Sequence, residues 1–123
     1  MVAKETANWY TSDMLMPNAS QAIVQRNKVV DYLLNDSHAD GAPKADFFRR
    51  FGFDKNDWKT LAKALMRHGA SGQVAKTVSS SYGTRYSVDG ILKTPDGRNP
   101  VVRTVWIIEE GSTTPRLITT HPA

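Results

Sequence analysis

The chain has 123 residues, of which 40% are hydrophobic and 23% charged, a composition typical of one ordinary globular domain. It contains no cysteine, which excludes disulfides, thiol nucleophiles and cysteine-ligated zinc, and its three histidines are too few for a histidine-rich metal site. Its 16 Lys and Arg against 12 Asp and Glu give a net charge of +4, which permits an anionic partner such as nucleic acid. We therefore predict no metal and no cofactor. No apolar run or basic leader suggests a membrane span or a signal peptide.

The N-terminal part shows a change of pattern near residue 18. Residues 1–17 have neither the helical nor the strand period, and we predict a lead-in arm or linker remnant there, followed by a single domain over residues 18–123. The stretch QAIVQ, residues 21–25, is compatible with a short strand. RNKVVDYLLN then has apolar residues at helical spacing, which predicts a helix over residues 27–35.

The segment NDSHADGAPKADFF, residues 35–48, interrupts this helix with Gly41 and Pro43. Pro43 suits the first turn of a new helix, where its missing N–H costs nothing. The new helix ends at Gly52. The segment is thus predicted to be a turn between two helices.

A third helix follows, DWKTLAKALMRHG, with Asp54 or Asn56 as its N-terminal cap. We predict Gly69 as its C-terminal cap and His68 as a cation in the last turn, where the helix dipole favours positive charge.

From residue 73 onward the pattern alternates with period two. Four strands are predicted, over residues 73–81, 84–92, 101–110 and 116–121. Short Gly-, Pro- and Asp-containing links indicate antiparallel pairing. The predicted fold is α+β, with N-terminal helices packed on one face of a four-stranded antiparallel sheet.

Several spaced elements resemble an uncharacterised bacterial domain family whose members are small stand-alone proteins or C-terminal ends of large secreted proteins. The matching elements are Tyr32-Leu33-Leu34, His38, Gly41, Lys44-Ala45, Phe48, Gly52-Phe53, Tyr82-Gly83, Tyr86, Gly97-Arg98, Val105-Trp106, Leu117 and Thr119. The family is similar to the barnase–EndoU–colicin–RelE group of small ribonuclease toxins, in which helices precede a four-stranded antiparallel sheet.

The resemblance implies a toxin domain that cleaves RNA, often tRNA, and is neutralised by a cognate immunity protein. It further implies delivery as the C-terminal part of a larger secreted protein and action in the cytoplasm of a target cell. A monomer bound to one immunity protein is the expected state. The alternative is a non-catalytic module of the same fold that binds RNA or protein.

Metal-free RNA cleavage needs a base for the 2′-hydroxyl, an acid for the leaving oxygen, and cations for the charge on the phosphorane. The catalytic candidates are His38, Lys44, Thr119 and His121. Lys44 stands at the start of a helix, where it opposes the dipole and where free N–H groups favour phosphate. Each candidate has a structural alternative: a loop or capping histidine, a lysine whose stem covers Phe48, a strand-forming threonine and a strand-end histidine.

Side chains on the predicted sheet and its loops are the candidates for substrate binding. They are Arg85, Arg98, Arg103, Thr104 and Trp106. Arginine suits phosphate and an aromatic ring can stack an unpaired base. The alternatives are arginines that serve solubility and a tryptophan buried in the core.

Overall fold

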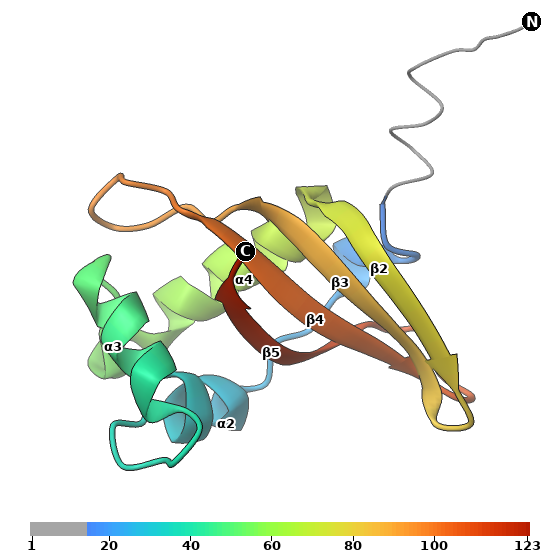
Figure 1. Ribbon diagram of the computed structural model, residues 1–123, viewed down its shortest axis with the longest axis horizontal. Coiled ribbons are helices and arrows are strands. Elements are labelled where there is room, and N and C mark those ends of the chain that lie inside the picture. The colour runs from blue at the N-terminus through green and yellow to red at the C-terminus, as the bar shows by residue number, and fades with distance from the viewer. Residues whose placement is uncertain (1–14) are drawn as a thin grey trace, which may run out of the picture.

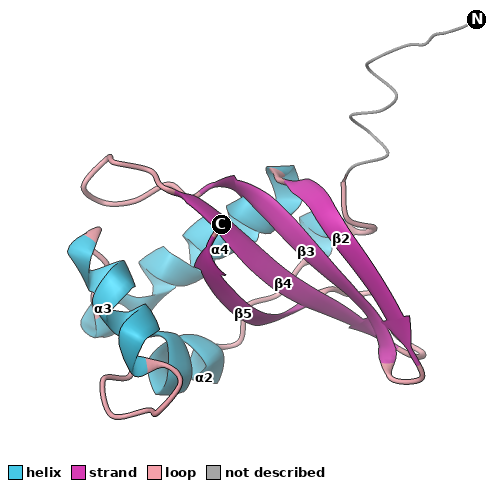
Figure 2. Cartoon of the chain, viewed as in Figure 1, coloured by secondary structure: helices cyan, strands magenta, loops and turns pink. Residues whose placement is uncertain are grey.

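The computed structural model describes residues 15–123, in which helices precede one antiparallel sheet of strand order β2-β3-β4-β5 (Figures 1 and 2). The helical elements are η1 (Ala19–Gln21), α2 (Arg26–Lys28), the π-turn η2 (Val29–Leu33), α3 (Ala42–Arg50), η3 (Lys55–Asp57) and α4 (Trp58–Ser71). The strands are β2 (Gln73–Ser80), β3 (Gly83–Ile91), β4 (Val101–Glu109) and β5 (Arg116–Pro122). The predicted α+β class is confirmed. Most of the predicted lead-in arm lies outside the described residues, while Met16 packs in the core.

The sheet has one face covered by α4 and one open face. Residues paired across antiparallel strands share a face, so the register assigns each side chain. Val88, Val102 and Trp106 face α4 and are fully buried. In Figure 1, α4 runs behind the sheet, so the viewer looks at the open face.

Three rows of cross-strand neighbours make up most of the open face. They are Val78–Arg85–Ile107–Arg116, Lys76–Ser87–Val105–Thr119 and Gln73–Asp89–Arg103–His121. Strand β4 contributes the third residue of each row and is one of the two inner strands of the sheet, as its two-sided apolar pattern predicts.

A β-bulge in β5 decides which of its side chains reach the open face. Trp106 pairs with Leu117, but the next β4 residue, Val105, pairs with Thr119, so Ile118 is the extra residue. The bulge reverses the alternation. Leu117 points into the core with Trp106, while Thr119 and His121 lie on the open face.

The N-terminal half runs along the outer edge of β5. Ile23 forms a single parallel bridge to Arg116, donating to the Pro115 carbonyl at 2.9 Å and accepting from Leu117 N–H at 3.1 Å. The predicted strand over residues 21–25 is therefore reduced to one bridge. α2, η2 and α3 follow beyond this edge, whereas α4 alone crosses behind the sheet (Figure 1).

The predicted helix over residues 27–35 is shorter and changes type. α2 makes one turn and passes into η2, where Leu34 N–H donates to the Val29 carbonyl at 2.8 Å. Such π-turns are uncommon and often occur at functional sites. Tyr32 lies in this turn.

The prediction that Gly69 caps the third helix is wrong, because α4 continues to Ser71 and Gly72 is its C-terminal cap. Gly69 is inside the helix for a steric reason. A Cβ built there would lie 2.5 Å from Cζ2 and 2.8 Å from Cε2 of Trp106. The glycine lets α4 lie directly against the indole ring.

Gly69→Ala is expected to destabilise the protein, although alanine in a helix interior is normally favoured over glycine by about 1 kcal/mol. The added methyl must displace the buried indole, and such overpacking costs about 1–3 kcal/mol. The free energy of unfolding from urea denaturation is the measurement. Lys63→Ala, on the exposed side of the same helix, is the control and is expected to change stability by less than about 0.5 kcal/mol. A gain in stability for Gly69→Ala would contradict this packing.

None of the helices between residues 15 and 123 combines the length and the apolar character that crossing a membrane requires.

Candidate functional site

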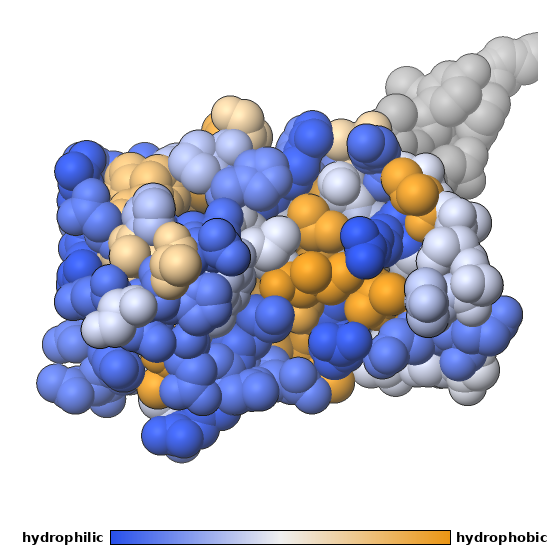
Figure 3. All heavy atoms as spheres, turned by 60° about the horizontal axis from the view of Figure 1, so that its bottom comes forward, coloured by the Kyte–Doolittle hydropathy of each residue, from blue (hydrophilic) through white to orange (hydrophobic). Residues whose placement is uncertain are grey.

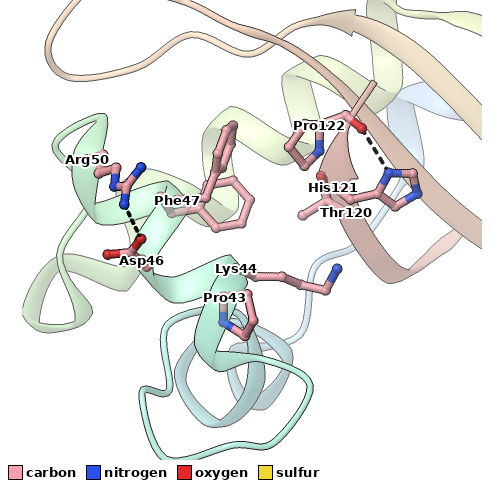
Figure 4. A pocket seen from close by; sticks show the side chains of 9 residues that line it. Pro43, Lys44, Asp46, Phe47, Arg50, Thr120, His121 and Pro122 are labelled. Carbon is pink, nitrogen blue, oxygen red and sulfur yellow. Dashed lines mark hydrogen bonds and ion pairs between the residues drawn. The ribbon is translucent and has the colours of Figure 1, made fainter.

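A pocket of about 350 Å³ lies between α3 and the end of β5. Its lining residues are Pro43, Lys44, Asp46, Phe47, Phe48, Arg50, Thr120, His121 and Pro122. Figure 4 shows the Lys44 side chain extending from α3 toward β5, on the side where the His121 ring lies. Two predicted catalytic residues that are far apart in the sequence thus line one pocket. α3 brings Lys44 there in its first turn, after Pro43.

His121 has a defined tautomer. Its Nδ1 lies 3.0 Å from the carbonyl oxygen of Pro122, and a carbonyl oxygen only accepts, so Nδ1 carries the proton. In the neutral form of the ring, the lone pair is then on Nε2. This nitrogen is available to take a proton from a substrate hydroxyl.

Thr119 forms a hydroxyl pair with Tyr32, whose Oη lies 3.2 Å from its Oγ1. The π-turn η2 carries Tyr32, and the β5 bulge turns Thr119 toward it. Tyr32 was not among the site residues predicted from the sequence. The one sequence feature that pointed to Tyr32 was its match to the family pattern, and that match did not assign Tyr32 a role.

His38 is linked to the site by its contact with Tyr32. The two rings meet edge to face with centroids 5.0 Å apart. Its Nδ1 accepts hydrogen bonds from the N–H groups of Asp40 and Gly41, each at 3.0 Å, so Nδ1 is unprotonated and organises the turn. Gly41 approaches η2 so closely that a Cβ would lie 2.1 Å from the Tyr32 carbonyl oxygen. In this structure His38 therefore fixes the turn and the Tyr32 ring.

Arg103 is held by Asp89 through two hydrogen bonds, Nε–Oδ1 at 2.7 Å and Nη2–Oδ2 at 2.8 Å. These bonds lower the pKa of Asp89 and raise that of Arg103. The pair lies in the same cross-strand row as His121. Its charge is already balanced, so Arg103 is a neighbour of the pocket whose charge is not free for a substrate.

The structure removes Thr104 and Trp106 from the substrate-binding candidates, because both are completely buried beneath α4. Trp106 Nε1–H donates to Thr104 Oγ1 at 2.7 Å, and the Thr104 hydroxyl lies 3.0 Å from Nδ1 of His68. His68 Nε2 lies 2.9 Å from the Val102 carbonyl and 3.1 Å from that of Gly90. Since carbonyls only accept, Nε2 carries the proton and Nδ1 accepts from Thr104.

His68 is consequently a neutral core residue, not the helix-end cation predicted from the sequence. It is 2% exposed. Burial lowers the pKa of His68, against the opposing effect of its two carbonyl partners and Asp89. The error arose because the helix continues beyond His68 and faces the sheet there.

Mild acid is expected to weaken the fold through His68. Its pKa is lowered in the native state from about 6.5 in the unfolded chain, so below that pH the unfolded state binds the proton more readily. The contribution of neutral, buried His68 to the free energy of unfolding is complete above about pH 6.5 and is lost as the pH falls toward the native pKa. In an NMR titration, the His68 ring should remain neutral at pH values where a histidine in an unfolded peptide is protonated. Titration at the ordinary value would contradict the neutral assignment.

The remaining predicted arginines lie in different surroundings. Arg98 binds Asp96, donates to the Arg50 carbonyl, and stacks its guanidinium 4.4 Å from the centre of the Phe51 ring. It fastens the β3–β4 loop to the end of α3. Arg85 is exposed on the open face near the β2–β3 turn, where it pairs with Ile107.

Two cations that were not predicted as site residues stand at the other end of β5. Arg116 lies on the open face, and Lys28 of α2 places its Nζ 5.1 Å from the centre of the Tyr32 ring. Burial, and then the charge of Arg116, lower the pKa of Lys28. Figure 3 shows the side of the molecule that is lower in Figure 1, where apolar surface is bordered and interrupted by hydrophilic side chains.

Within residues 15–123, no group of three His, Asp or Glu side chains is arranged to hold a metal ion. The groups that gather at the edge of β5 are an imidazole, a lysine, two hydroxyls and further cations. These groups can transfer protons and bind phosphate oxygens without a metal.

The chain belongs to the family of DUF6883, a domain of unknown function, whose model matches residues 15–123. No curated protein matches the sequence. Among solved structures, a chain of the contact-dependent growth inhibition toxin–immunity protein complex from Klebsiella pneumoniae 342 has the same fold, with a TM-score of 0.64 and 18% identity. The alignment covers 85% of this chain and 95% of that one.

Proposed function

We propose that this domain is a toxin that cleaves RNA, with tRNA as the substrate, without a metal, and that a cognate immunity protein neutralises it. The observation that carries the proposal is the meeting of Lys44 and His121 in one pocket, at the edge of a sheet face rich in cations. The fold shared with a chain of a toxin–immunity complex supports it.

The chemistry assigned to the pocket is a transesterification. Nε2 of His121 takes the proton of a ribose 2′-hydroxyl, whose oxygen attacks the adjacent phosphorus. The Lys44 ammonium offsets the charge that develops on the phosphorane. The bond from phosphorus to the 5′-oxygen breaks, and that oxygen takes a proton from the Tyr32–Thr119 hydroxyl pair. The products are a 2′,3′-cyclic phosphate and a 5′-hydroxyl.

The structural relative is named for both a toxin and its immunity protein. We assign this chain to the toxin side because of its charge. A net charge of +4 and a lysine-lined pocket suit RNA, whereas a protein that covers a cationic active site needs an acidic surface. Delivery as the C-terminal part of a larger secreted protein belongs to the same proposal.

The decisive experiment expresses the domain in bacteria with and without the neighbouring gene, and incubates purified protein with total tRNA in the presence and absence of EDTA. Growth arrest that the neighbour relieves, together with cleavage insensitive to EDTA and ending in a cyclic phosphate, is the expected result. A harmless domain that leaves RNA intact would refute the ribonuclease and favour the non-catalytic binding module.

A further inference from the structure

The edge of β5 carries a second group of cations that the proposed reaction does not use. Arg116 stands three residues before Thr119, and Lys28 approaches from α2. The Ile23–Arg116 bridge holds the start of the α2 segment against this part of the strand. The two positive charges come from separate elements and are close enough for Arg116 to affect the titration of Lys28.

Such a juxtaposition disfavours the folded state unless an anion lies nearby. Between residues 15 and 123, the structure gives Lys28 no ion-pair partner. Arg116 has one, Glu109, through Nε at 3.3 Å, with the carboxylate side chain 55% exposed. The guanidinium therefore keeps donors for a second acceptor.

The position of these cations relative to the pocket is fixed by the strand. Arg116, Thr119 and His121 all lie on the open face, with Thr119 in between. Lys28 Nζ lies over the Tyr32 ring, and the hydroxyl of that ring meets Thr119. From Arg116 to His121 the strand spans about 16 Å, at about 3.3 Å per residue, which is more than one phosphate occupies.

We propose that Lys28 and Arg116 form a second phosphate-binding subsite for the same single-stranded RNA, on the far side of the Tyr32–Thr119 hydroxyl pair from the Lys44–His121 pocket. This subsite rests on the proposed function for the identity of its ligand. It binds a phosphate farther along the strand than the one that reacts, through charge alone, and so aligns the strand without reading its bases.

Binding of an uncleavable 2′-O-methyl RNA oligonucleotide, measured at several salt concentrations, tests the subsite. Each phosphate contact contributes about 0.7–1 to the slope of log affinity against log salt. The variants Lys28→Met and Arg116→Met are each expected to reduce the slope by about that amount. Lys63→Met, on the exposed side of α4, is the matched control and should leave the slope unchanged. Melting temperatures identify any variant whose fold is affected.

Cleavage kinetics separate the subsite from the pocket. For a dinucleotide, whose single phosphate occupies the pocket, Arg116→Met should keep the native kcat and KM. For a longer RNA this variant should raise KM and leave kcat unchanged. An unchanged salt slope in folded Lys28→Met and Arg116→Met overturns the subsite, as does failure of the native protein to bind the oligonucleotide. A native protein that binds through these cations but cleaves nothing would refute the ribonuclease and retain the subsite.

Discussion

His121→Ala is expected to reduce the rate constant of RNA cleavage by about 10²–10⁴-fold, the usual contribution of one general acid–base group. The reason is the free lone pair on Nε2, which the Pro122 carbonyl secures by accepting the Nδ1 proton. Lys44→Met should cost about 10²–10³-fold, because it removes a charge that stabilises the phosphorane. Single-turnover cleavage of total tRNA by purified protein is the measurement.

Both side chains are only partly buried at the rim of the pocket, so the melting temperature should change little. Lys59→Met, on the exposed start of α4, is the control for loss of one positive charge and should cleave at the native rate. If folded His121→Ala cleaves as fast as the native protein, His121 is not the base. The pocket would then be a binding feature only.

Substitution of the other two histidines is expected to have different effects, because His38 shapes a turn and His68 lies in the core. His38→Ala removes two acceptor bonds that shape the turn before α3 and the ring that packs on Tyr32. It should lower both stability and activity, as a positioning residue does. His68 lies in the core, and its replacement should act on stability alone.

The helices and strands followed from patterns that are local in the sequence. Period two, broken by short Gly- and Pro-containing links, predicts four antiparallel strands, and those strands are present. The turn at residues 35–41 followed in the same way from Gly41 and Pro43. Naming Lys44 and His121 among the catalytic candidates required only that each residue type suit phosphate chemistry, whereas their position in one pocket came from the structure.

Features that depend on distant partners could not be predicted. Simple alternation would put Leu117, Thr119 and His121 on one face, but the bulge at Ile118 separates Leu117 from the other two. Gly69 resembled a helix cap because the indole that requires it lies far ahead in the chain, at Trp106.

The dependence on distant partners also explains why the sequence did not indicate Tyr32 and did not separate Thr104 and Trp106 from the surface residues. Tyr32 belongs to the site only because a π-turn directs it at Thr119. Thr104 and Trp106 were candidates for substrate binding, with a buried core position as the alternative for Trp106, because the sequence did not show which face of β4 the helices cover. The covering face is set by α4, through contacts that join residues far apart.

Thr104→Val is the second substitution with a large expected effect. Valine has nearly the same shape and is also β-branched, as residues that favour strands are, so the change replaces only the hydroxyl with a methyl group. The indole N–H of Trp106 and Nδ1 of His68 both lose their partner in the buried core. Each unsatisfied buried group costs about 1–3 kcal/mol, so the loss of two partners should lower the free energy of unfolding by about 2–6 kcal/mol.

Thr119→Val is the matched control, on the neighbouring strand but on the open face. It breaks one partly buried hydrogen bond to Tyr32 and should cost only about 0.5–1.5 kcal/mol. The effects on RNA cleavage should be the reverse of the effects on stability. Folded Thr104→Val should cleave at the native rate, and Thr119→Val should lose activity. If Thr104→Val were as stable as the native protein but inactive, its hydroxyl would have to reach the substrate. The burial of β4 beneath α4 would then not describe the protein in its substrate-bound state.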